Sequence, residues 1–309
     1  VMSYPLIGNY GVNSEDNESS RPWVEMLVVR HLSPRGSNFR REMDLGDYMK
    51  EHDIPGIEGV DTRALTKLLR SQGSMNAMLT CAQQFDVGQV LERLHAYKVR
   101  DTIQKVTRSA PEEFPAIGEE RYHVAMMDYG VKQNMIDCLR RRGCSVTALP
   151  ASTPAEEVLA GGYDGVLLSN GPGDPAENTA LIAQVKKLYD SSLPLFGLGL
   201  GHQLLALATG ARTEKLPYGH RGGNVPVRDL ELGRVFITSQ NHGYAVVRDS
   251  VDPAVAQVSL ENVNDGSCEG LRYARPNCFS TQFHPEGNTG PKAVEYLFDR
   301  FVGSMGGAK

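Results

Sequence analysis

The stretch that decides the fold is Leu195-Phe196-Gly197-Leu198-Gly199-Leu200-Gly201-His202-Gln203-Leu204-Leu205. Its apolar beginning predicts a buried strand, its end predicts a helix, and glycines crowd the turn between them. The pattern Gly-x-Nuc-x-Gly belongs to a strand–turn–helix that exposes a central nucleophile, because the flanking glycines remove side chains that would collide in the tight turn. The central residue should be Ser or Cys, but here it is Gly199. The stretch therefore predicts this turn without its nucleophile.

On both sides of this stretch, apolar segments of strand length alternate with segments of helical character. Strands are expected at residues 124–127, 144–149, 166–169 and 279–283 and from Leu195 onward, and helices at 134–142, 177–189 and from 154 and 203 onward. Strands that alternate with helices imply right-handed βαβ units and a parallel sheet covered on both faces. We therefore predict an α/β protein with a doubly wound, mostly parallel sheet.

The N-terminal part of the chain has a different pattern. Residues 1–60 are rich in turn residues and predict irregular structure with short strands. A helix is expected over residues 60–72, where leucines share one face and Asp61 or Thr62 can cap the first turn. Residues 87–97 predict a second helix. This part is therefore expected to form a smaller α+β domain.

The boundary between the two parts is expected at residues 109–122, a polar segment with two prolines that is typical of a linker. The predicted domains are thus 1–108 and 123–305. The chain begins abruptly at Tyr4-Pro-Leu-Ile-Gly-Asn, so the first domain is expected to be truncated at its start.

Loops that follow the predicted strands carry the polar residues. Asn170-Gly-Pro-Gly-Asp-Pro175 follows one strand, Gly199 the next and His284 a late one. Ligands of parallel sheets bind at these carboxyl ends. The glycine loop enters a helix, so its backbone N–H groups could hold a carboxylate, a phosphate or a developing oxyanion, although taken alone it is equally consistent with a plain turn.

Two short polar segments suggest further site residues. In His284-Pro285-Glu286, a carboxylate could orient the histidine as a general base for a thiol or hydroxyl. Most isolated pairs of this kind are solvated surface groups, so its value comes from sharing a chain with the Gly199 turn. The segment Gln240-Asn-His-Gly-Tyr244 is suited to binding an amide, but alone it is a weak indication.

Two other chemistries fit the sequence poorly. A dinucleotide fingerprint requires G-x-G-x-x-G, and both registers through Gly197 and Gly199 fail, at His202 and Leu204 respectively. A metal site could draw on His202, His220, His242 and His284, but their positions show no ligand spacing. We therefore expect no metal and no cofactor in this chain.

Composition indicates a soluble globular protein with a small negative charge. The 309 residues suffice for two domains with cores, 40% of residues are hydrophobic and 22% are charged. A net charge of −5 without a basic run argues against a nucleic-acid surface. No apolar stretch approaches the roughly 18–20 residues of a membrane helix, and the N-terminus lacks a signal core. We expect neither nucleic acid nor membrane as a partner.

The five cysteines are odd in number and scattered, without a C-x-x-C pair, and they are Cys81, Cys138, Cys144, Cys268 and Cys278. This usage fits a reducing, cytoplasmic compartment and provides neither a zinc site nor a disulfide framework. The simplest expectation is five small buried apolar side chains.

Taken together, the motifs resemble a class I, triad-type glutamine amidotransferase. Gly197-Leu-Gly-Leu-Gly-His-Gln, Asn170-Gly-Pro-Gly-Asp-Pro, Gln240-Asn-His-Gly-Tyr and His284-Pro-Glu carry this resemblance. Asp128-Tyr-Gly-Val-Lys-Gln-Asn, Tyr218-Gly-His-Arg-Gly-Gly-Asn-Val-Pro-Val, Asp61-Thr-Arg-Ala-Leu-Thr and Tyr4-Pro-Leu-Ile-Gly-Asn-Tyr-Gly narrow it to the small subunit of carbamoyl phosphate synthetase. The resemblance covers essentially the whole chain.

The resemblance implies a glutamine-hydrolysing enzyme subunit. Its large-subunit partner would use the released ammonia with bicarbonate, ATP and Mg to make carbamoyl phosphate for arginine and pyrimidine synthesis, while this chain itself would hold no cofactor. The family's catalytic Cys, base and acid correspond to Gly199, His284 and Glu286, and its oxyanion donors to Gly173 and Leu200. Its contacts to L-glutamine correspond to Gly171, Gly173, Leu200, Gln203, Asn241, Gly243 and Tyr244.

The chain departs from the family at two places. Gly199 cannot form a thioester, and further N-terminal residues of the family, which include strands and a serine that contacts glutamine, are absent. Cys278 is a poor substitute, since six extended residues place it roughly 20 Å from His284.

Three interpretations remain open. The chain is an amidotransferase subunit by descent that does not hydrolyse glutamine, or a non-catalytic binding subunit of an ammonia-dependent synthetase. Some members of the wider family lack the cysteine and use free ammonia. An unrelated doubly wound hydrolase would require another nucleophile near His284, and the sequence offers none.

Overall fold

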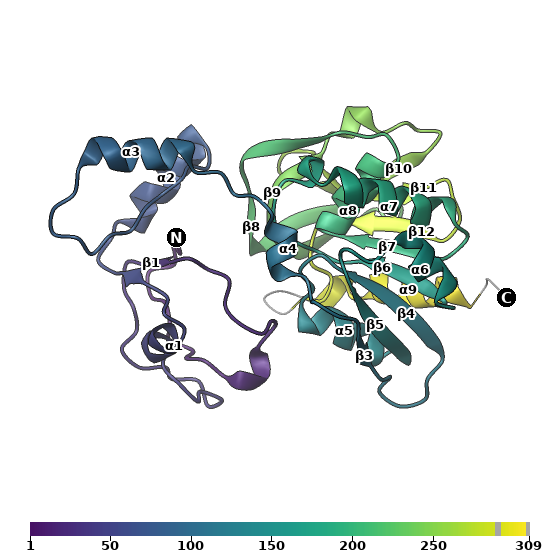
Figure 1. Cartoon of the computed structure of the whole chain (residues 1–309), viewed down its shortest axis with the longest axis horizontal. Coiled ribbons are helices and arrows are strands. Elements are labelled where there is room, and N and C mark those ends of the chain that lie inside the picture. Colours follow the sequence, from purple (N-terminus) through teal and green to yellow (C-terminus); the bar gives the residue numbers. More distant parts are fainter. Residues whose placement is uncertain (288–291, 307–309) are drawn as a thin grey trace. The chain divides into compact units, whose positions relative to one another are not determined.

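The computed structural model describes residues 1–287 and 292–306. The chain divides into two compact units, Val1–Lys98 and Val99–Lys309 (Figure 1). The second unit begins before the predicted boundary because residues near 107 pack on its sheet: Thr107 Oγ1 accepts a hydrogen bond from Ala151 N at 2.9 Å. The predicted linker also includes a strand, β3 (Glu112–Phe114), which pairs antiparallel with β5 (Cys144–Pro150).

The first unit has little regular structure, as expected. Its elements are η1 (Ser14–Asp16), β1 (Leu27–Val28), α1 (Leu45–Glu51), β2 (Gly56–Ile57), α2 (Thr62–Gln72) and α3 (Val87–Ala96). Strands β1 and β2 pair parallel. The predicted cap of α2 is confirmed, since Asp61 accepts a hydrogen bond from Ala64 N at 2.9 Å, and the helix ends at Gly73, whose φ of 86° lies in the left-handed region.

The second unit alternates strands and helices in its first half. The elements are α4 (Thr102–Val106), β3, β4 (Tyr122–Asp128), α5 (Gln133–Arg140), β5, α6 (Ala155–Ala160), β6 (Gly165–Leu168), η2 (Pro175–Glu177), α7 (Thr179–Asp190), β7 (Leu195–Leu198) and α8 (Leu200–Ala208). The second half contains β8 (Thr213–Asp229), β9 (Arg234–Val246), η3 (Arg248–Ser250), β10 (Ala256–Asn262), β11 (Cys268–Tyr273), β12 (Cys278–Thr281), η4 (Lys292–Val294) and α9 (Tyr296–Met305).

Within the described residues these strands form one ten-stranded sheet in the order β10-β8-β9-β11-β12-β7-β6-β4-β5-β3. The run β12-β7-β6-β4-β5 is parallel throughout, which confirms the doubly wound core. Strands β8 to β11 extend it with antiparallel pairs that the helix–strand alternation did not predict. Among the described residues, no α-helix lies between these strands, so the alternation of strands and helices that identifies βαβ units does not predict them.

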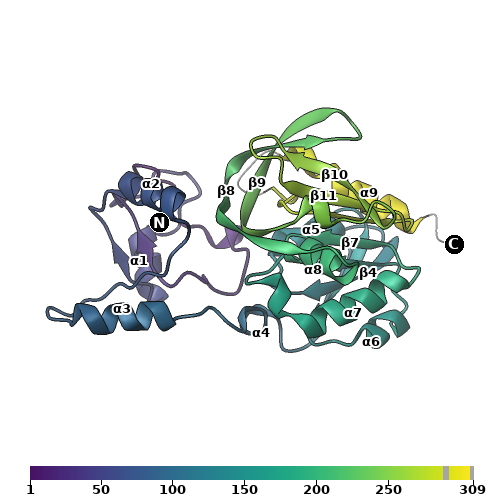
Figure 2. The ribbon, with the colours of Figure 1, turned by 90° about the horizontal axis from the view of Figure 1, so that it is seen from above.

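Helices cover both faces of the parallel core because its strands alternate between two apolar clusters. On β4, Val124 and Met126 pack with residues of α5 and α9, whereas Ala125 and Met127 pack with α6, α7 and α8. Figure 2 shows α6, α7 and α8 on one side of the sheet and α9 on the other. This burial on both faces leaves the strand ends as the places where polar side chains can gather.

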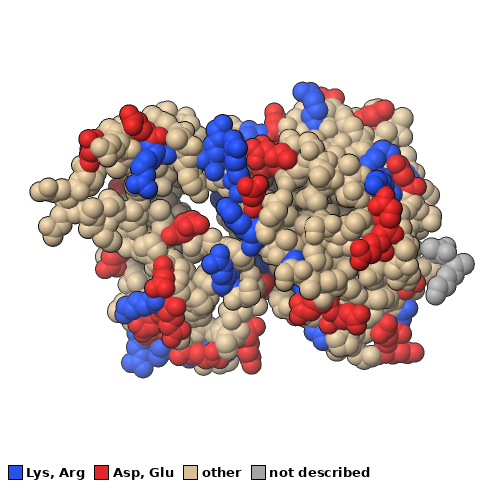
Figure 3. All heavy atoms as spheres, in the orientation of Figure 1, with Lys and Arg blue, Asp and Glu red and all other residues tan. Residues whose placement is uncertain are grey.

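The surface agrees with the modest net charge. The face of the second unit seen in Figure 3 carries acidic and basic side chains interspersed among uncharged ones. In the described part of the chain, no helix combines the length and apolar character that a bilayer crossing would need.

Candidate functional site

The turn at Gly199 has the strand–turn–helix geometry that the sequence predicts. Gly199 joins β7 to α8 with φ 54° and ψ −108°, in the region that disfavours side chains. The flanking glycines are needed for steric reasons: a Cβ at Gly201 would lie 2.3 Å from Leu168 O, and one at Gly197 would lie 2.9 Å from Gly201 O. The close packing of β7, α8 and β6 thus explains the glycine spacing.

A side chain at Gly199 would fit only with a small shift of Asn170. A Cβ there would meet Asn170 Cβ at 3.1 Å and Gln282 O at 3.9 Å. It would therefore lie between the glycine loop after β6 and the segment that leads from β12 to His284. A non-glycine residue at this φ costs of order 1–3 kcal/mol, and the surrounding packing has to compensate this strain.

The predicted base and acid are in contact. His284 Nδ1 lies 2.9 Å from Glu286 Oε1, and the backbone of His284 is anchored by its N–H bond to Ser239 O at 2.9 Å. Because an ionised carboxylate only accepts hydrogen bonds, this contact places the ring proton on Nδ1 and leaves Nε2 to accept a proton. The arrangement is that of an oriented general base.

Glu286 is fully buried, with 0% of its surface exposed, and it is held by two residues from the β4–α5 region. Lys132 Nζ donates to Glu286 Oε1 at 2.8 Å, and Asn134 Nδ2 donates to Glu286 O at 2.7 Å. Burial alone would raise the pKa of Glu286, but the charges and hydrogen bonds of His284 and Lys132 lower it to about 2. The carboxylate is therefore charged and fixed.

Lys132 and Asn134 were missed as site residues by sequence reasoning. Both lie in the segment Asp128-Tyr-Gly-Val-Lys-Gln-Asn, which supported the resemblance without suggesting a role. A cation and an amide that follow a strand end, at the cap and in the first turn of the next helix, were the available signal. Their distance of about 150 residues along the chain from Glu286 explains why spacing did not reveal them.

The glycine loop after β6 lies against the turn at Gly199. A Cβ at Gly171 would lie 2.3 Å from Tyr129 O and 2.8 Å from Leu200 Cδ2, so only glycine fits there. Gly173 has φ 98°, and Thr102 Oγ1 donates to the neighbouring Pro172 O at 3.1 Å. Leu200 is the first residue of α8, where a helix leaves N–H groups without intrahelical partners. The structure thus brings Gly171 of the glycine loop against Leu200, while the oxyanion role of Gly173 and Leu200 stays a prediction.

The predicted glutamine contacts from α8 and β9 are brought together only in part. Gln203 is buried and donates from Nε2 to Tyr244 O at 2.7 Å and to Gln282 Oε1 at 2.8 Å, so its amide joins α8, β9 and the end of β12. Burial and the nearby Asp174 raise the pKa of Tyr244, which places this side chain by the glycine loop. Asn241 is exposed and pairs across the sheet with Arg221.

The cysteines differ from expectation at one position. Cys138, Cys144, Cys268 and Cys278 are buried, but Cys81 is exposed in the first unit. Burial raises the pKa of Cys138 and Cys144 to about 11 and that of Cys268 and Cys278 to about 12. These four thiols are therefore poor nucleophiles at neutral pH.

Comparison with known proteins finds a matching family model for each of the two units. Residues 125–304 match the model of the family "Glutamine amidotransferase class-I". The fold of this region also resembles that of a Thermoplasma acidophilum protein described as one of the subunits of a GMP synthase, with a TM-score of 0.54 and 21% identity over 61% of this chain and 96% of that chain. The fold and the site thus define a class-I glutamine amidotransferase domain.

The first unit and the full-length relatives narrow this class. Residues 1–79 match the model "Carbamoyl-phosphate synthase small chain, CPSase domain". Carbamoyl phosphate synthase small chains of Bacillus cereus and Symbiobacterium thermophilum are 43% and 44% identical to this chain, over 98% of it and over 81% and 84% of their own lengths. The chain belongs to the carbamoyl phosphate synthase small-chain family.

Proposed function

We propose that this chain is the amidotransferase subunit of a carbamoyl phosphate synthetase and that it does not hydrolyse glutamine. The observation that carries this proposal is the combination of an ordered base with an absent nucleophile. His284, Glu286 and Lys132 form a connected set, whereas Gly199 offers no atom that could attack an amide carbonyl.

Other side chains are poorly suited to replace the nucleophile. The buried thiols have raised pKa values, and Cys278 belongs to β12, where it pairs with Leu195 at the far end of β7 from Gly199. Ser239 lies within strand β9 and contacts His284 through its backbone carbonyl, which accepts the His284 N–H bond. Loss of a nucleophile typically lowers turnover on the order of a million-fold, which would leave glutamine hydrolysis at background.

The proposed role is to support a large subunit that takes free ammonia. In this role the partner binds ATP, Mg and bicarbonate, this chain needs no cofactor, and the carbamoyl phosphate serves arginine and pyrimidine synthesis in the cytoplasm. L-glutamine remains a candidate ligand because Gly199 removes bulk from the pocket rather than adding it. Gly171, Gly173, Leu200, Gln203, Asn241, Gly243 and Tyr244 are the proposed contacts.

The test compares two nitrogen donors in the reconstituted complex. The chain is combined with the large subunit of a family member, and carbamoyl phosphate is measured with ammonium or with glutamine as donor. We expect product with ammonium, and with glutamine none above the level that the isolated large subunit gives. Glutamine-dependent product above that level would contradict the proposal, and its loss in the His284→Ala variant would assign the hydrolysis to this site.

Glutamine binding is tested separately by calorimetry on the chain. If the parent binds glutamine, Asn241→Ala should weaken the affinity by about tenfold, the loss expected for one hydrogen bond to a ligand. The matched control is Asn224→Ala, which removes an exposed amide from the neighbouring strand β8. Equal affinity of the parent and the Asn241→Ala variant would remove the segment 240–244 from the amide pocket.

A further inference from the structure

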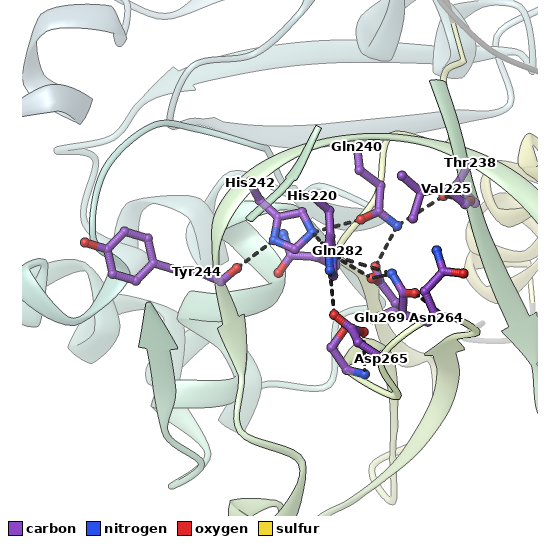
Figure 4. A network of polar contacts seen from close by, with 12 residues as sticks. His220, Val225, Thr238, Gln240, His242, Tyr244, Asn264, Asp265, Glu269 and Gln282 are labelled. Atoms are coloured by element: carbon purple, nitrogen blue, oxygen red, sulfur yellow. Dashed lines mark hydrogen bonds and ion pairs between the residues drawn. The ribbon is translucent and has the colours of Figure 1, made fainter. Parts of the chain in front are cut away.

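A second polar cluster lies in the antiparallel part of the sheet, apart from the His284–Glu286 pair. It joins His220 on β8, Gln240 and His242 on β9, Glu269 on β11 and Asp265 in the loop before β11. Figure 4 shows these side chains directed toward His220. Glu269 is 0% exposed and Gln240 is 2% exposed, whereas Asp265 reaches solvent. The cluster is thus a largely buried group with a route to the outside.

One nitrogen of each histidine must donate a hydrogen bond. His220 Nε2 lies 2.8 Å from Asp265 Oδ2, and His242 Nδ1 lies 2.8 Å from Tyr244 O. A carbonyl and an ionised carboxylate only accept, so these two ring nitrogens carry the protons. If both rings are neutral, His220 Nδ1 and His242 Nε2 are left with lone pairs.

The two lone-pair nitrogens face each other and two oxygens. His220 Nδ1 lies 3.2 Å from His242 Nε2 and 3.3 Å from Glu269 Oε1. His242 Nε2 also lies 2.9 Å from Gln240 Oε1. The orientation of Gln240 is determined by its other end, because Nε2 donates to Glu269 Oε2 at 3.0 Å and to Thr238 Oγ1 at 3.1 Å.

The side-chain amide of Asn262 is a nearby hydrogen-bond donor, but it satisfies only part of this group of acceptors. Asn262 Nδ2 donates to Glu269 Oε1 at 3.0 Å but lies 3.5 Å from His220 Nδ1, too far for a strong hydrogen bond. With both rings neutral, four atoms with lone pairs therefore surround one small space, where a bound cation or an additional proton would give favourable pairing.

We propose that this space binds a divalent transition-metal ion, with zinc as the best match, through His220 Nδ1, His242 Nε2 and Glu269 Oε1. Two histidines and a carboxylate are an established zinc donor set. Zinc–ligand distances of about 2.0–2.1 Å in a tetrahedron imply ligand–ligand distances of about 3.3 Å. Two ligand pairs already have such spacing, 3.2 and 3.3 Å, and the ligand atoms of the three residues all lie within 4.8 Å of one another.

The surroundings of the ligands match those of a metal centre. Histidine ligands commonly donate their other N–H to a carboxylate or a backbone carbonyl, which orients the ring. Asp265 does this for His220, and the carbonyl of Tyr244 does it for His242. Asp265 is in turn held by Ser267, whose N–H and hydroxyl both donate to Oδ1.

The metal would connect three strands and would bind His242 within the segment 240–244. His220, His242 and Glu269 come from β8, β9 and β11, and His242 lies between Asn241 and Gly243. An ion here would therefore hold this segment in place without any part in bond breaking.

The test measures metal binding by the whole chain, without glutamine or a partner. Protein in a Cys81→Ser background, which removes the exposed thiol, is stripped with chelator and dialysed against zinc, and bound metal is quantified. We expect about one zinc per chain. Cobalt is the spectroscopic probe, and its visible absorption should show a four-coordinate site with nitrogen and oxygen ligands.

Variants distinguish this site from adventitious surface binding. His220→Ala should abolish the cobalt spectrum, and Asp265→Asn, at a partly exposed position, should weaken affinity about 10- to 100-fold while the chain stays folded. Glu269→Gln keeps the side-chain shape and should remove high-affinity binding. The exposed His95→Ala is the matched control and should change nothing.

Two results would overturn the proposal. In one, the parent retains no more zinc than the His220→Ala variant, in which case a proton alone occupies the space. In the other, the cobalt spectrum is the same in the parent and in the folded Asp265→Asn and Glu269→Gln variants, which would place the ion elsewhere. Both readouts are independent of glutamine hydrolysis and of the large subunit.

Discussion

Two buried glutamates of the second unit lie beside histidines and differ in what compensates their charge. Glu286 receives His284 and the ammonium of Lys132, at 2.9 and 2.8 Å. Glu269 receives the neutral amides of Gln240 and Asn262, with His220 at 3.3 Å. Both glutamates are 0% exposed.

The comparison shows that the role of a histidine–glutamate pair depends on whether a third residue compensates the charge of the glutamate. A buried carboxylate needs a compensating partner because its desolvation is costly. Lys132 supplies that charge at Glu286, so His284 is free to act as a base. Around Glu269 no lysine or arginine ammonium or guanidinium is among its described hydrogen-bond partners, and the arrangement suits an added cation.

The largest expected effect distinguishes the two histidines by activity. Gly199→Cys should raise glutamine hydrolysis by three or more orders of magnitude, recovering part of the roughly million-fold loss from a missing nucleophile. In that background, His284→Ala should lower turnover about 10²- to 10⁴-fold, as for loss of a general base, whereas His220→Ala should leave it within about tenfold. Ammonia release from glutamine is the measurement.

This rescue has a built-in control. An electrophilic glutamine analogue should label the introduced thiol, as peptide mass spectrometry can show. Labelling that His284→Ala leaves unchanged would contradict the role of His284. Equal losses from His284→Ala and His220→Ala would erase the distinction between the two clusters.

The next effect tests the charge compensation at Glu286. Lys132→Met should lower the free energy of unfolding by about 3 kcal/mol, because it leaves a buried carboxylate without its cation. The matched control, Lys187→Met, removes an exposed partner of Glu156 and should cost under about 1 kcal/mol. Urea unfolding followed by circular dichroism measures both, and similar midpoints for the two variants would count against a structural role of Lys132.

Acidification tests the same carboxylate without changing a neighbour. The pKa of Glu286 is lowered from 4.5 to about 2, so its contribution is fully present above pH 4.5 and is lost as the pH falls toward 2. The shift corresponds to about 3 kcal/mol. The stability difference between the parent and Glu286→Gln should therefore shrink over this range. A difference that stays constant with pH would refute the assignment.

The smallest effect concerns the second glutamate. In metal-free buffer, Glu269→Gln should cost about 1–2 kcal/mol, because one acceptor oxygen is replaced by a donor that faces another donor. Zinc should then raise the melting temperature of the parent but not of the variant, since only the parent gains binding free energy in the folded state. If Glu269→Gln lowered the free energy of unfolding more than Lys132→Met does, Glu269 rather than Glu286 would be the more strongly stabilised carboxylate, contrary to this comparison.

Local patterns accounted for much of the fold. The β4–α8 alternation, the cap at Asp61 and the glycine turn at Gly199 were predicted because each depends on residues close in sequence. The antiparallel strands β8–β11 and the strand β3 were not predicted, since pairing between distant segments has no short-range signal. The extent of Cys81 exposure also depended on tertiary packing.

The residues of the candidate site likewise fall into those that short motifs predicted and those that only the fold revealed. Gly199, His284 and Glu286 are recognisable from motifs of a few residues, and the contact between His284 and Glu286 is confirmed. Lys132 and Asn134 were found only when the fold brought the loop after β4 to the loop after β12. The role of the proposed glutamine contacts is a prediction that the binding experiments address.

By itself, the sequence determined that this chain has a strand–turn–helix with glycine where a nucleophile belongs, since that absence is a property of residue 199 alone. Only the tertiary structure decided which histidine obtains a compensated glutamate and which meets other acceptors. Four histidines without regular spacing indicated no metal site, yet β8, β9 and β11 bring His220, His242 and Glu269 within 4.8 Å. Cross-strand pairing sets such distances, and it is specified by the packing of the whole sheet rather than by neighbours in the chain.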